Sequence, residues 1–215
     1  MKFETLDAWL HHIEGLHAQA IDLGLDRMET MLKRLDIRFK CPVFTVGGTN
    51  GKGSTCAFIE SALLAGGYSV GVHTSPHLIR FNERVRINGE DAKDEELIRQ
   101  FEKVEAARGE MTLSYFEYTL LGILLLFAEK DLDAVVLKSG SADVLTLSTR
   151  LSRPSPSLQA SELTIRLISE LPVNPLAGKR LTFTVRASRL SALTLILRLR
   201  LSSTPIKSVP NSWLS

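Results

Sequence analysis

The chain has 215 residues, of which 44% are hydrophobic and 23% charged, and its formal net charge is +2. This length allows one large domain or two small ones with a sizeable core. Its two cysteines, Cys41 and Cys56, lack metal-ligand spacing, and no apolar run reaches the roughly 20 residues that a membrane span needs. We therefore expect reduced thiols in a soluble, cytoplasmic protein without a signal peptide.

Helical and extended patterns alternate through the first part of the chain. Apolar residues at helical spacing indicate amphipathic helices, and short apolar runs next to glycine indicate strands. In chain order these patterns predict a helix over residues 6–16, a helix over 26–35, a strand over 43–46, a helix over 55–65 and a strand over 68–73.

The alternation continues as far as Leu137. It predicts a hairpin-like strand over residues 84–90, an amphipathic helix over 91–108, a more buried helix over 114–130 and a buried parallel strand over 133–137. Strands that alternate with helices favour a doubly wound, mostly parallel α/β sheet, whose ligands bind at the carboxyl ends of the strands. With no further strand, residues 135–137 would form an apolar edge that promotes aggregation.

The composition changes abruptly after Leu137. Residues 1–137 hold 15 Lys+Arg and 21 Asp+Glu (15 − 21 = −6), whereas residues 138–215 hold 11 and 3 (11 − 3 = +8). Prolines are scattered through this second part outside recognisable turn sequences, and only residues 190–201 show a strand-like alternation. We assign no domain to residues 138–215 and expect a disordered or non-native tail.

A glycine-rich segment over residues 47–55 lies between the first predicted strand and the next helix. Glycines allow backbone N–H groups to converge on one point, where the start of the helix adds partial positive charge. Lys52 is placed to reach the β- and γ-phosphates of a nucleotide, and a hydroxyl of Ser54 or Thr55 is placed to ligate magnesium. The segment therefore predicts a nucleoside triphosphate site, although Gly53 separates the lysine from the hydroxyls, unlike the common pattern.

Four segments together resemble the folylpolyglutamate synthase/dihydrofolate synthase family, a branch of the Mur-type ATP-dependent ligases. The bifunctional bacterial type is the most similar. The segments are residues 21–25, 46–55, 75–78 with 83–86, and 113–117. The resemblance implies that residues 1–137 are the N-terminal part of a Mur-ligase-type ATP-binding domain.

The resemblance also implies an activity. In this family, ATP phosphorylates a carboxylate of dihydropteroate or of a folate glutamyl tail, and the amine of L-glutamate then attacks the acyl phosphate. The products are an amide, ADP and phosphate. The implied cofactors are ATP and Mg²⁺, and the implied partners are these small molecules, with no nucleic acid, no membrane and a monomeric state.

The motif match assigns individual roles to residues of this chain. Lys52 would be catalytic, because it would neutralise charge on the transferred phosphoryl group. The implied ATP-binding residues are Thr49, Asn50, Gly51, Lys52, Gly53 and Ser54, and the implied metal-binding hydroxyls are those of Ser54 and Ser75. The implied substrate-binding residues are Ile21, Asp22, Leu23, His77, Leu113, Ser114, Tyr115 and Phe116.

Each of these assignments has a plainer alternative. Residues 75–76 would suit an ordinary turn, and His77 would suit a solvated or packing histidine. Tyr115 and Phe116 in an apolar helix would commonly be core residues, and Arg84 and Arg86 would commonly lie on a solvated strand face. The joint occurrence of the motifs carries the resemblance.

The resemblance stops at the junction between residues 137 and 138. Here the family has Glu-Val-Gly-Leu-Gly-Gly-Arg-Leu-Asp-Ala, whose glutamate ligates magnesium, whereas residues 138–147 read Lys-Ser-Gly-Ser-Ala-Asp-Val-Leu-Thr-Leu. When this segment is written in suitable codons, one added guanine regroups it into the family segment. Residues 161–168 and 175–186 regroup in the same way into the family's Asp-His and Gly-Arg-Glu-Lys-Ala segments. We therefore predict that one nucleotide is missing and that residues 138–215 are an out-of-frame tail.

Two functional alternatives stay open. The chain could derive from another Mur-type ligase or a phosphate-loop kinase, or it could be a non-catalytic nucleotide-binding protein whose basic tail contacts nucleic acid. Because the family's metal-binding acids and its C-terminal domain are missing, we expect the chain itself to be inactive and poorly folded. The sequence leaves open whether the intact enzyme makes dihydrofolate, extends the polyglutamate tail, or does both.

Overall fold

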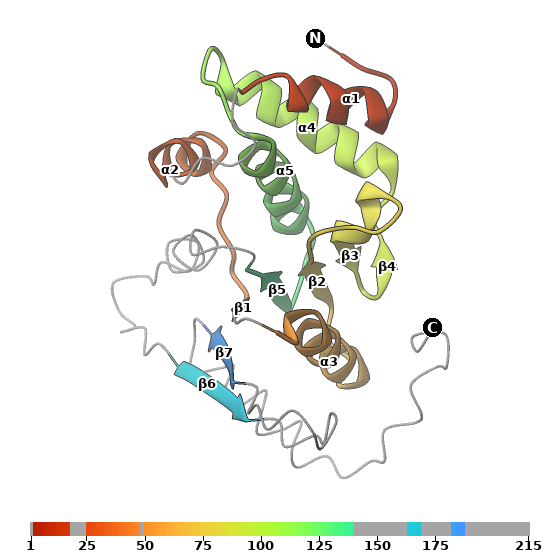
Figure 1. The fold of residues 1–215 in the computed structure, drawn as a ribbon, viewed down its shortest axis with the longest axis vertical. Helices are drawn as coiled ribbons and strands as arrows, with labels where there is room; N and C mark the ends of the chain where they lie inside the picture. The colour runs from red at the N-terminus through yellow and green to blue at the C-terminus, as the bar shows by residue number, and fades with distance from the viewer. Residues whose placement is uncertain (1, 18–24, 48–49, 140–162, 169–181, 188–215) are drawn as a thin grey trace.

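A seven-stranded mixed sheet with helices on both faces forms the centre of the computed structural model (Figure 1). The structure describes residues 2–17, 25–47, 50–139, 163–168 and 182–187, the last two ranges and Leu25 by their backbone alone. The strand order is β4-β3-β2-β5-β1-β7-β6. Most of the segment after residue 139 lies outside the described residues. So do four of the predicted site residues, Ile21, Asp22, Leu23 and Thr49.

Three parallel strands form the middle of the sheet and confirm the predicted parallel arrangement. They are β1 (Val43–Gly47), β5 (Ala134–Lys138) and β2 (Val70–His73). On the side of β2, β3 (Val85–Ile87) and β4 (Glu90–Asp91) extend the sheet as an antiparallel hairpin. On the side of β1, β7 (Thr182–Ala187) and β6 (Leu163–Ile168) add two further antiparallel strands.

The predicted apolar edge at residues 135–137 is wrong. β5 is hydrogen-bonded to β2 on one side and to β1 on the other, so it is an inner strand. The chain order of the strands suggested an edge because β5 comes last in the alternating pattern, but a crossover inserts it between two earlier strands. β5 also includes Lys138, one residue beyond the predicted strand. The sequence patterns predicted neither β6 nor β7, and the strand-like residues 190–201 lie outside the described residues.

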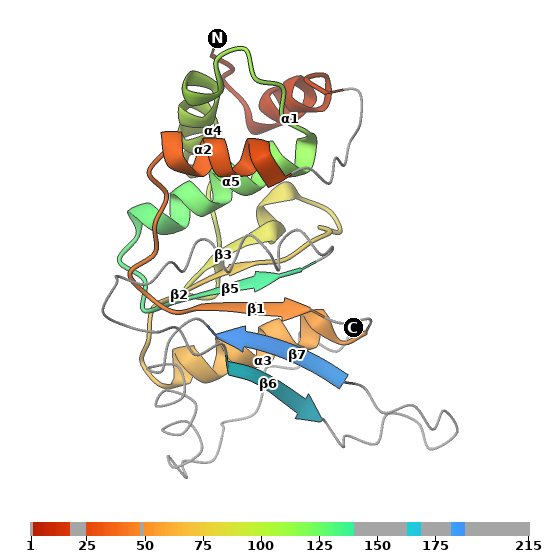
Figure 2. The ribbon, with the colours of Figure 1, turned by 90° about the vertical axis from the view of Figure 1, so that its left-hand side faces the viewer.

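Helices cover the two faces of the sheet unequally (Figure 2). One face carries α1 (Leu6–Glu14), α2 (Leu25–Arg34), α4 (Asp94–Arg108) and α5 (Tyr115–Glu129). The other face carries α3 (Lys52–Ala65), and a 3₁₀ turn, η1 (Phe81–Arg84), precedes β3. The predicted helices are therefore confirmed, with ends that differ by a few residues, as helix ends commonly do.

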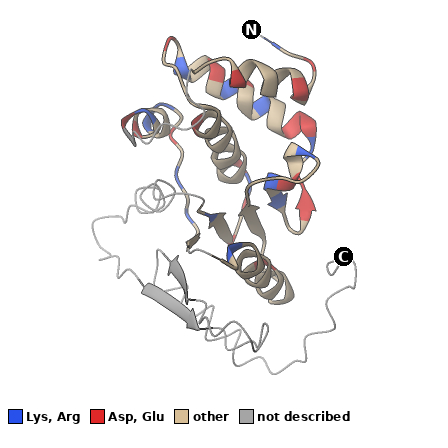
Figure 3. Ribbon diagram, in the orientation of Figure 1, with Lys and Arg blue, Asp and Glu red and all other residues tan. Residues whose placement is uncertain are grey.

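The helix α5 lies against the sheet and is almost entirely apolar, which explains its burial. Ten consecutive side chains from Tyr118 to Phe127 are buried, and Figure 3 shows charges on the outer helices rather than along α5. A capping box starts the helix, because Ser114 accepts a hydrogen bond from the Glu117 backbone N–H while Glu117 accepts one from that of Ser114. The carboxylate of Glu117 also accepts hydrogen bonds of 3.2 Å from the guanidinium of Arg27 in α2, which link these two helices.

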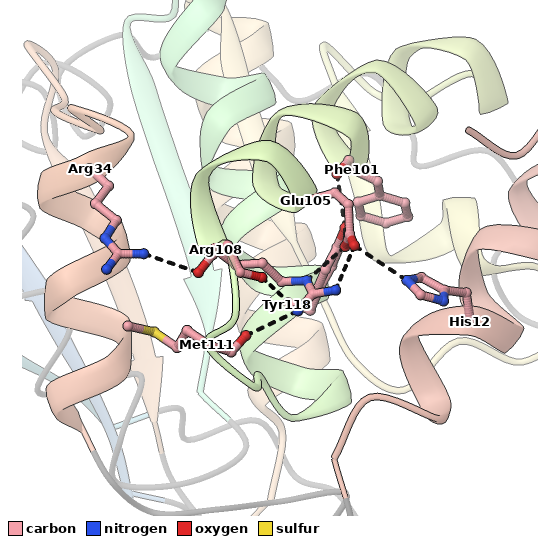
Figure 4. A network of polar contacts seen from close by, with 8 residues as sticks. His12, Arg34, Phe101, Glu105, Arg108, Met111 and Tyr118 are labelled. Atoms are coloured by element: carbon pink, nitrogen blue, oxygen red, sulfur yellow. Dashed lines mark hydrogen bonds and ion pairs between the residues drawn. The ribbon is translucent and has the colours of Figure 1, made fainter. Parts of the chain in front are cut away.

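A polar network joins α1, α4 and α5 on the outer side of this layer (Figure 4). Glu105 accepts hydrogen bonds from Arg108 at 2.8 Å and from the Tyr118 hydroxyl at 3.0 Å, and His12 lies 3.6 Å from the same carboxylate. The Tyr118 hydroxyl lies 2.9 Å from the Phe101 carbonyl oxygen. Arg34 of α2 donates to the carbonyl of Arg108 at 3.0 Å, so all four helices of this layer are linked by polar contacts.

Candidate functional site

The glycine-rich loop lies at the carboxyl end of β1 and leads directly into α3, as predicted. Gly51 precedes the helix with φ of 74°, a left-handed conformation that glycine adopts at low cost. Thr55 anchors the turn, because both its N–H and its hydroxyl donate to the Gly51 carbonyl, at 2.9 and 3.0 Å. The first turn of α3 therefore presents its backbone N–H groups and its positive dipole end at the edge of the sheet.

The side chains of this turn leave the site accessible to solvent. Gly53 and Ser54 are exposed, Lys52 is half-buried, and a Cβ atom added at Gly53 would meet nothing within 4 Å. The predicted ATP-binding residues from Asn50 to Ser54 therefore lie together on one turn, while Thr49 lies outside the described residues. A turn of this geometry can bind a phosphate group, since helix N-termini and αL glycines form anion sites.

Lys138 ends β5 at the same edge of the sheet, next to this loop. Its Cα atom is in register with Val46 of β1, and the neighbouring Ser139 N–H donates to the Val46 carbonyl at 2.9 Å. The Lys138 ammonium donates a hydrogen bond to the carbonyl oxygen of Ser75, in the loop after β2. Burial and the nearby charge of Lys52 lower the pKa of Lys138. Sequence reasoning missed this residue because it assigned residue 138 to the tail.

The residues at this edge do not suit a magnesium ion. Magnesium prefers carboxylate and other oxygen ligands in an octahedral arrangement. The predicted hydroxyls belong to Ser54, which is exposed, and Ser75, which is half-buried, and the nearby end of β5 brings an ammonium rather than a carboxylate. Among the described residues, no group of three or more His, Cys, Asp or Glu side chains is arranged to hold a metal ion.

A buried ion pair ties the far side of α3 to β3. Arg86 donates to Glu60 through Nε at 3.1 Å and through a second, shorter contact, and both side chains are largely buried. The plainer alternative of a solvated strand face therefore does not hold for Arg86, because α3 covers that side of the hairpin. Between this pair and the loop lies Cys56, a buried thiol whose pKa burial raises to about 12.

Two of the predicted substrate-binding residues meet at Arg84. Arg84 donates through Nε to Nδ1 of His77 at 2.7 Å, and its guanidinium lies 5.9 Å from the ring centre of Tyr115. The same guanidinium lies 5.5 Å from the ring of Phe81. Arg84 is half-buried, so it is a packed residue rather than part of a solvated strand face. No sequence pattern indicated this contact, because 31 positions separate Arg84 from Tyr115.

The other described members of the predicted substrate set have visible structural roles. Leu113 is fully buried in the main core, and Ser114 is the N-cap of α5 with 1% of its surface exposed. Phe116 is partly buried and packs against the same core. These contacts agree with the plainer alternative for Phe116, and they show that the motif over residues 113–117 starts a helix.

The loop after β2 is held in a defined shape beside a cleft of about 660 Å³. Glu83 accepts hydrogen bonds from three successive backbone N–H groups, those of Leu78, Ile79 and Arg80, at 2.7 to 2.9 Å. These bonds lower the pKa of Glu83. Residues of this loop and of the β3–β4 hairpin line the cleft, and none of its described lining residues belongs to the glycine-rich loop.

Two buried polar side chains lie near the carboxyl ends of β1 and β2. Nδ1 of His73 lies 2.9 Å from the Arg84 carbonyl oxygen, while His73 Nε2 and Thr45 Oγ1 have no hydrogen-bond partner within the described part of the chain. Burial lowers the pKa of His73 to about 4, so its imidazole is neutral at physiological pH.

Sequence comparison shows that part of the chain is similar to bifunctional synthases. The dihydrofolate synthase/folylpolyglutamate synthase of Escherichia coli is 48% identical over 136 residues, and that of Haemophilus influenzae is 46% identical over 136 residues. Each alignment covers 63% of this chain but only 32% and 31% of the two relatives, so the chain spans about a third of their length. No family model matches the chain.

Solved structures show the same partial likeness. The Escherichia coli enzyme in complex with DHPP and ADP has a TM-score of 0.62 at 47% identity, and the Yersinia pestis enzyme complexed with AMPPNP and a manganese ion has one of 0.61 at 48%. Both matches cover 64% of this chain, and 33% and 34% of those chains. They confirm the resemblance and the α/β fold for this part of the chain, and the nucleotides and metal in them agree with the cofactors it implies.

None of the helices in the described part of the chain is both long and apolar enough to cross a membrane.

Proposed function

We propose that residues 1–137 are the N-terminal part of the ATP-binding domain of a ligase that joins L-glutamate to dihydropteroate or to folate glutamyl tails. The observation that carries this proposal is the left-handed Gly51 that leads into α3 at the carboxyl end of β1, with Lys52 as the first helical residue. The relatives with this architecture and 46 to 48% identity support it, because solved examples hold ADP or AMPPNP.

The chemistry of the loop follows from its geometry. Backbone N–H groups of the first turn of α3 bind phosphate oxygens, and the helix dipole favours their negative charge. Lys52 stabilises the charge that develops while a phosphoryl group moves from ATP to a substrate carboxylate. The acyl phosphate then reacts with the amine of glutamate, which releases phosphate. In the intact ligase a bound magnesium ion would supply further charge stabilisation, for which the described residues of this chain lack the ligands.

We assign the substrate side of the site to the residues gathered around Arg84. His77 and Tyr115 both contact Arg84, and an aromatic ring beside a guanidinium suits a flat, polar heterocycle with a carboxylate-bearing tail. Ile21, Asp22 and Leu23 stay predictions that rest on the motif. The substrates are small molecules, and we place the protein in the cytoplasm as a monomer with two reduced thiols.

We further propose that the 215-residue chain is catalytically inactive and that residues 138–215 are an out-of-frame tail. The abrupt change to a net charge of +8 and the regrouped family segments support this. So does Lys138, which stands where the resemblance places a magnesium-binding glutamate. Sequencing of the genomic DNA across codons 130–150 tests the proposal, because an extra base there would restore the glutamate. A template that reads as translated here would contradict it.

Calorimetric titration with ATP tests the nucleotide site in the whole chain. We expect measurable binding by the wild-type chain and a loss of at least about tenfold in Lys52→Ala, because one charge-assisted contact to phosphate disappears. Lys33→Ala, an exposed residue of α2, is the matched control and should leave binding unchanged. No heat of binding from a folded wild-type chain would contradict the nucleotide site. ATP turnover that depends on a pteroate compound would contradict the proposed inactivity.

A further inference from the structure

We propose that Lys138 takes the place of a divalent cation, so that this chain binds the polyphosphate of a nucleotide without metal. The proposal rests on the proposed nucleotide site and concerns which positive charges complete it. Its basis is that Lys138 ends β5 and Lys52 begins α3 at the same carboxyl edge of the sheet.

The backbone fixes where Lys138 stands. β1 and β5 run parallel, so both end at the edge where the glycine-rich loop begins, and Lys138 is in register with Val46. Val46 packs in the small core beneath α3, and residues in register point to the same face of a sheet. The Lys138 side chain therefore lies on the α3 face, and its ammonium donates a hydrogen bond to the Ser75 carbonyl in the loop after β2.

The charges around this position favour an anion. Lys138 lies beside Val46 at the end of β1, Lys52 is the first residue of α3, and the charge of Lys52 contributes to the lowered pKa of Lys138. The acid on α3 closest in sequence to the loop, Glu60, is engaged by Arg86. Two ammonium groups beside a helix N-terminus repel each other, and a polyphosphate that bridges them removes that repulsion. A magnesium ion in the same place would add to it.

A magnesium ion and a lysine ammonium also differ in how they interact with a phosphate group. Magnesium coordinates several oxygens at about 2.1 Å and needs protein or water oxygens to complete its shell. A lysine donates up to three hydrogen bonds and needs no further ligand. Because Lys138 already uses one donor on the Ser75 carbonyl, two remain for phosphate oxygens. Metal-free ATP, which carries more negative charge than its magnesium complex, is therefore the better ligand for this site.

The test measures binding of ATP and of inorganic tripolyphosphate to the full chain by calorimetry, once with EDTA and once with excess magnesium. We expect the wild-type chain to bind both ligands in EDTA at least as tightly as in magnesium. Lys138→Glu should lose about tenfold or more in EDTA and recover in magnesium, since a carboxylate can ligate the ion. Lys138→Gln should lose less in EDTA and should not recover. Lys33→Glu carries the same charge change on α2 and should alter neither affinity by more than about twofold.

Several outcomes separate this proposal from the nucleotide site itself. Wild-type binding that requires magnesium would overturn the role of Lys138 but would not contradict the nucleotide site. An affinity of Lys138→Glu in EDTA equal to that of the wild type would have the same meaning. Metal-free binding of tripolyphosphate without binding of ATP would support the phosphate site and contradict the nucleotide function. No binding by a chain with a cooperative urea transition would overturn both. Circular dichroism of each variant shows whether a loss of binding is a loss of fold.

Discussion

The two faces of the sheet differ in how much of their packing lies within the described residues. On the face of α1, α2, α4 and α5, one cluster contains 25 buried hydrophobic residues, whereas the cluster beneath α3 contains 8. The larger face carries the capping box of α5 and the Glu105 network, and the smaller one carries the glycine-rich loop. One layer therefore holds the fold together, and the other layer presents the phosphate site.

The largest expected effect comes from removing an aromatic side chain from the four-helix face. Phe101 is fully buried and its ring centre lies 5.8 Å from that of Tyr118 and 6.0 Å from that of Phe81. Phe101→Ala should lower the free energy of unfolding by about 3–5 kcal/mol, because it leaves a cavity between three elements. Urea denaturation followed by circular dichroism measures this loss.

The matched control for Phe101 lies on the other face. Phe58 of α3 is 61% exposed, so Phe58→Ala removes the same atoms from solvent rather than from a core. Its effect should stay within about 0.5 kcal/mol. If both variants lost the same stability, Phe58 would be as well packed as Phe101, and the contrast between the two faces would fail.

A smaller effect is expected from adding a single methyl group to each face. A Cβ atom at Gly122 of α5 would lie 2.6 Å from two ring carbons of Phe101, whereas one at Gly53 of α3 would meet nothing within 4 Å. Gly122→Ala should cost about 1–3 kcal/mol, because the ring has to move within a packed core. Gly53→Ala should be neutral or stabilising by up to about 1 kcal/mol. Thermal unfolding of both variants checks the contrast, and a destabilised Gly53→Ala would argue against an open first turn.

Much of this fold follows from sequence periodicity, because each helix and strand carries its own local pattern. The strand, glycine loop and helix around Lys52 could be placed in order, and residues 113–117 could be recognised as a motif, although not as the capping box that starts α5. The contacts between distant segments could not. Arg27 meets Glu117 across 90 positions, and Arg84 meets Tyr115 across the chain, since the sheet order decides these contacts.

The candidate site shows the same division between local and distant information. The motif located the phosphate loop, because a glycine-rich segment of nine residues at the junction of a strand and a helix is a local feature. It did not locate Lys138, whose position depends on a crossover that inserts β5 between β2 and β1. The same crossover explains why the expected apolar edge at residues 135–137 is an inner strand.

The smallest expected effect concerns the polar network that closes the four-helix face. Burial alone would raise the pKa of Glu105, but hydrogen bonds from Arg108 and Tyr118, with the charges of Arg108 and His12, hold it below its usual value. The folded state therefore favours the ionised carboxylate. Its contribution to stability is present above the pKa of an unfolded glutamate, about 4.3, and is lost as the pH falls through the lower folded pKa.

Glu105→Gln should therefore lower the free energy of unfolding by about 1–2 kcal/mol at pH 7, because a charge-assisted contact becomes a neutral one. The difference between variant and wild type should shrink as the pH falls below about 4, where the wild-type carboxylate is also neutral. Glu110→Gln, at an exposed position just after α4, is the control and should show neither effect. Urea denaturation at pH 7 and pH 3.5 measures both. A gap that stayed constant between these pH values would mean that Glu105 stabilises α1, α4 and α5 by its shape and hydrogen bonds rather than by its charge.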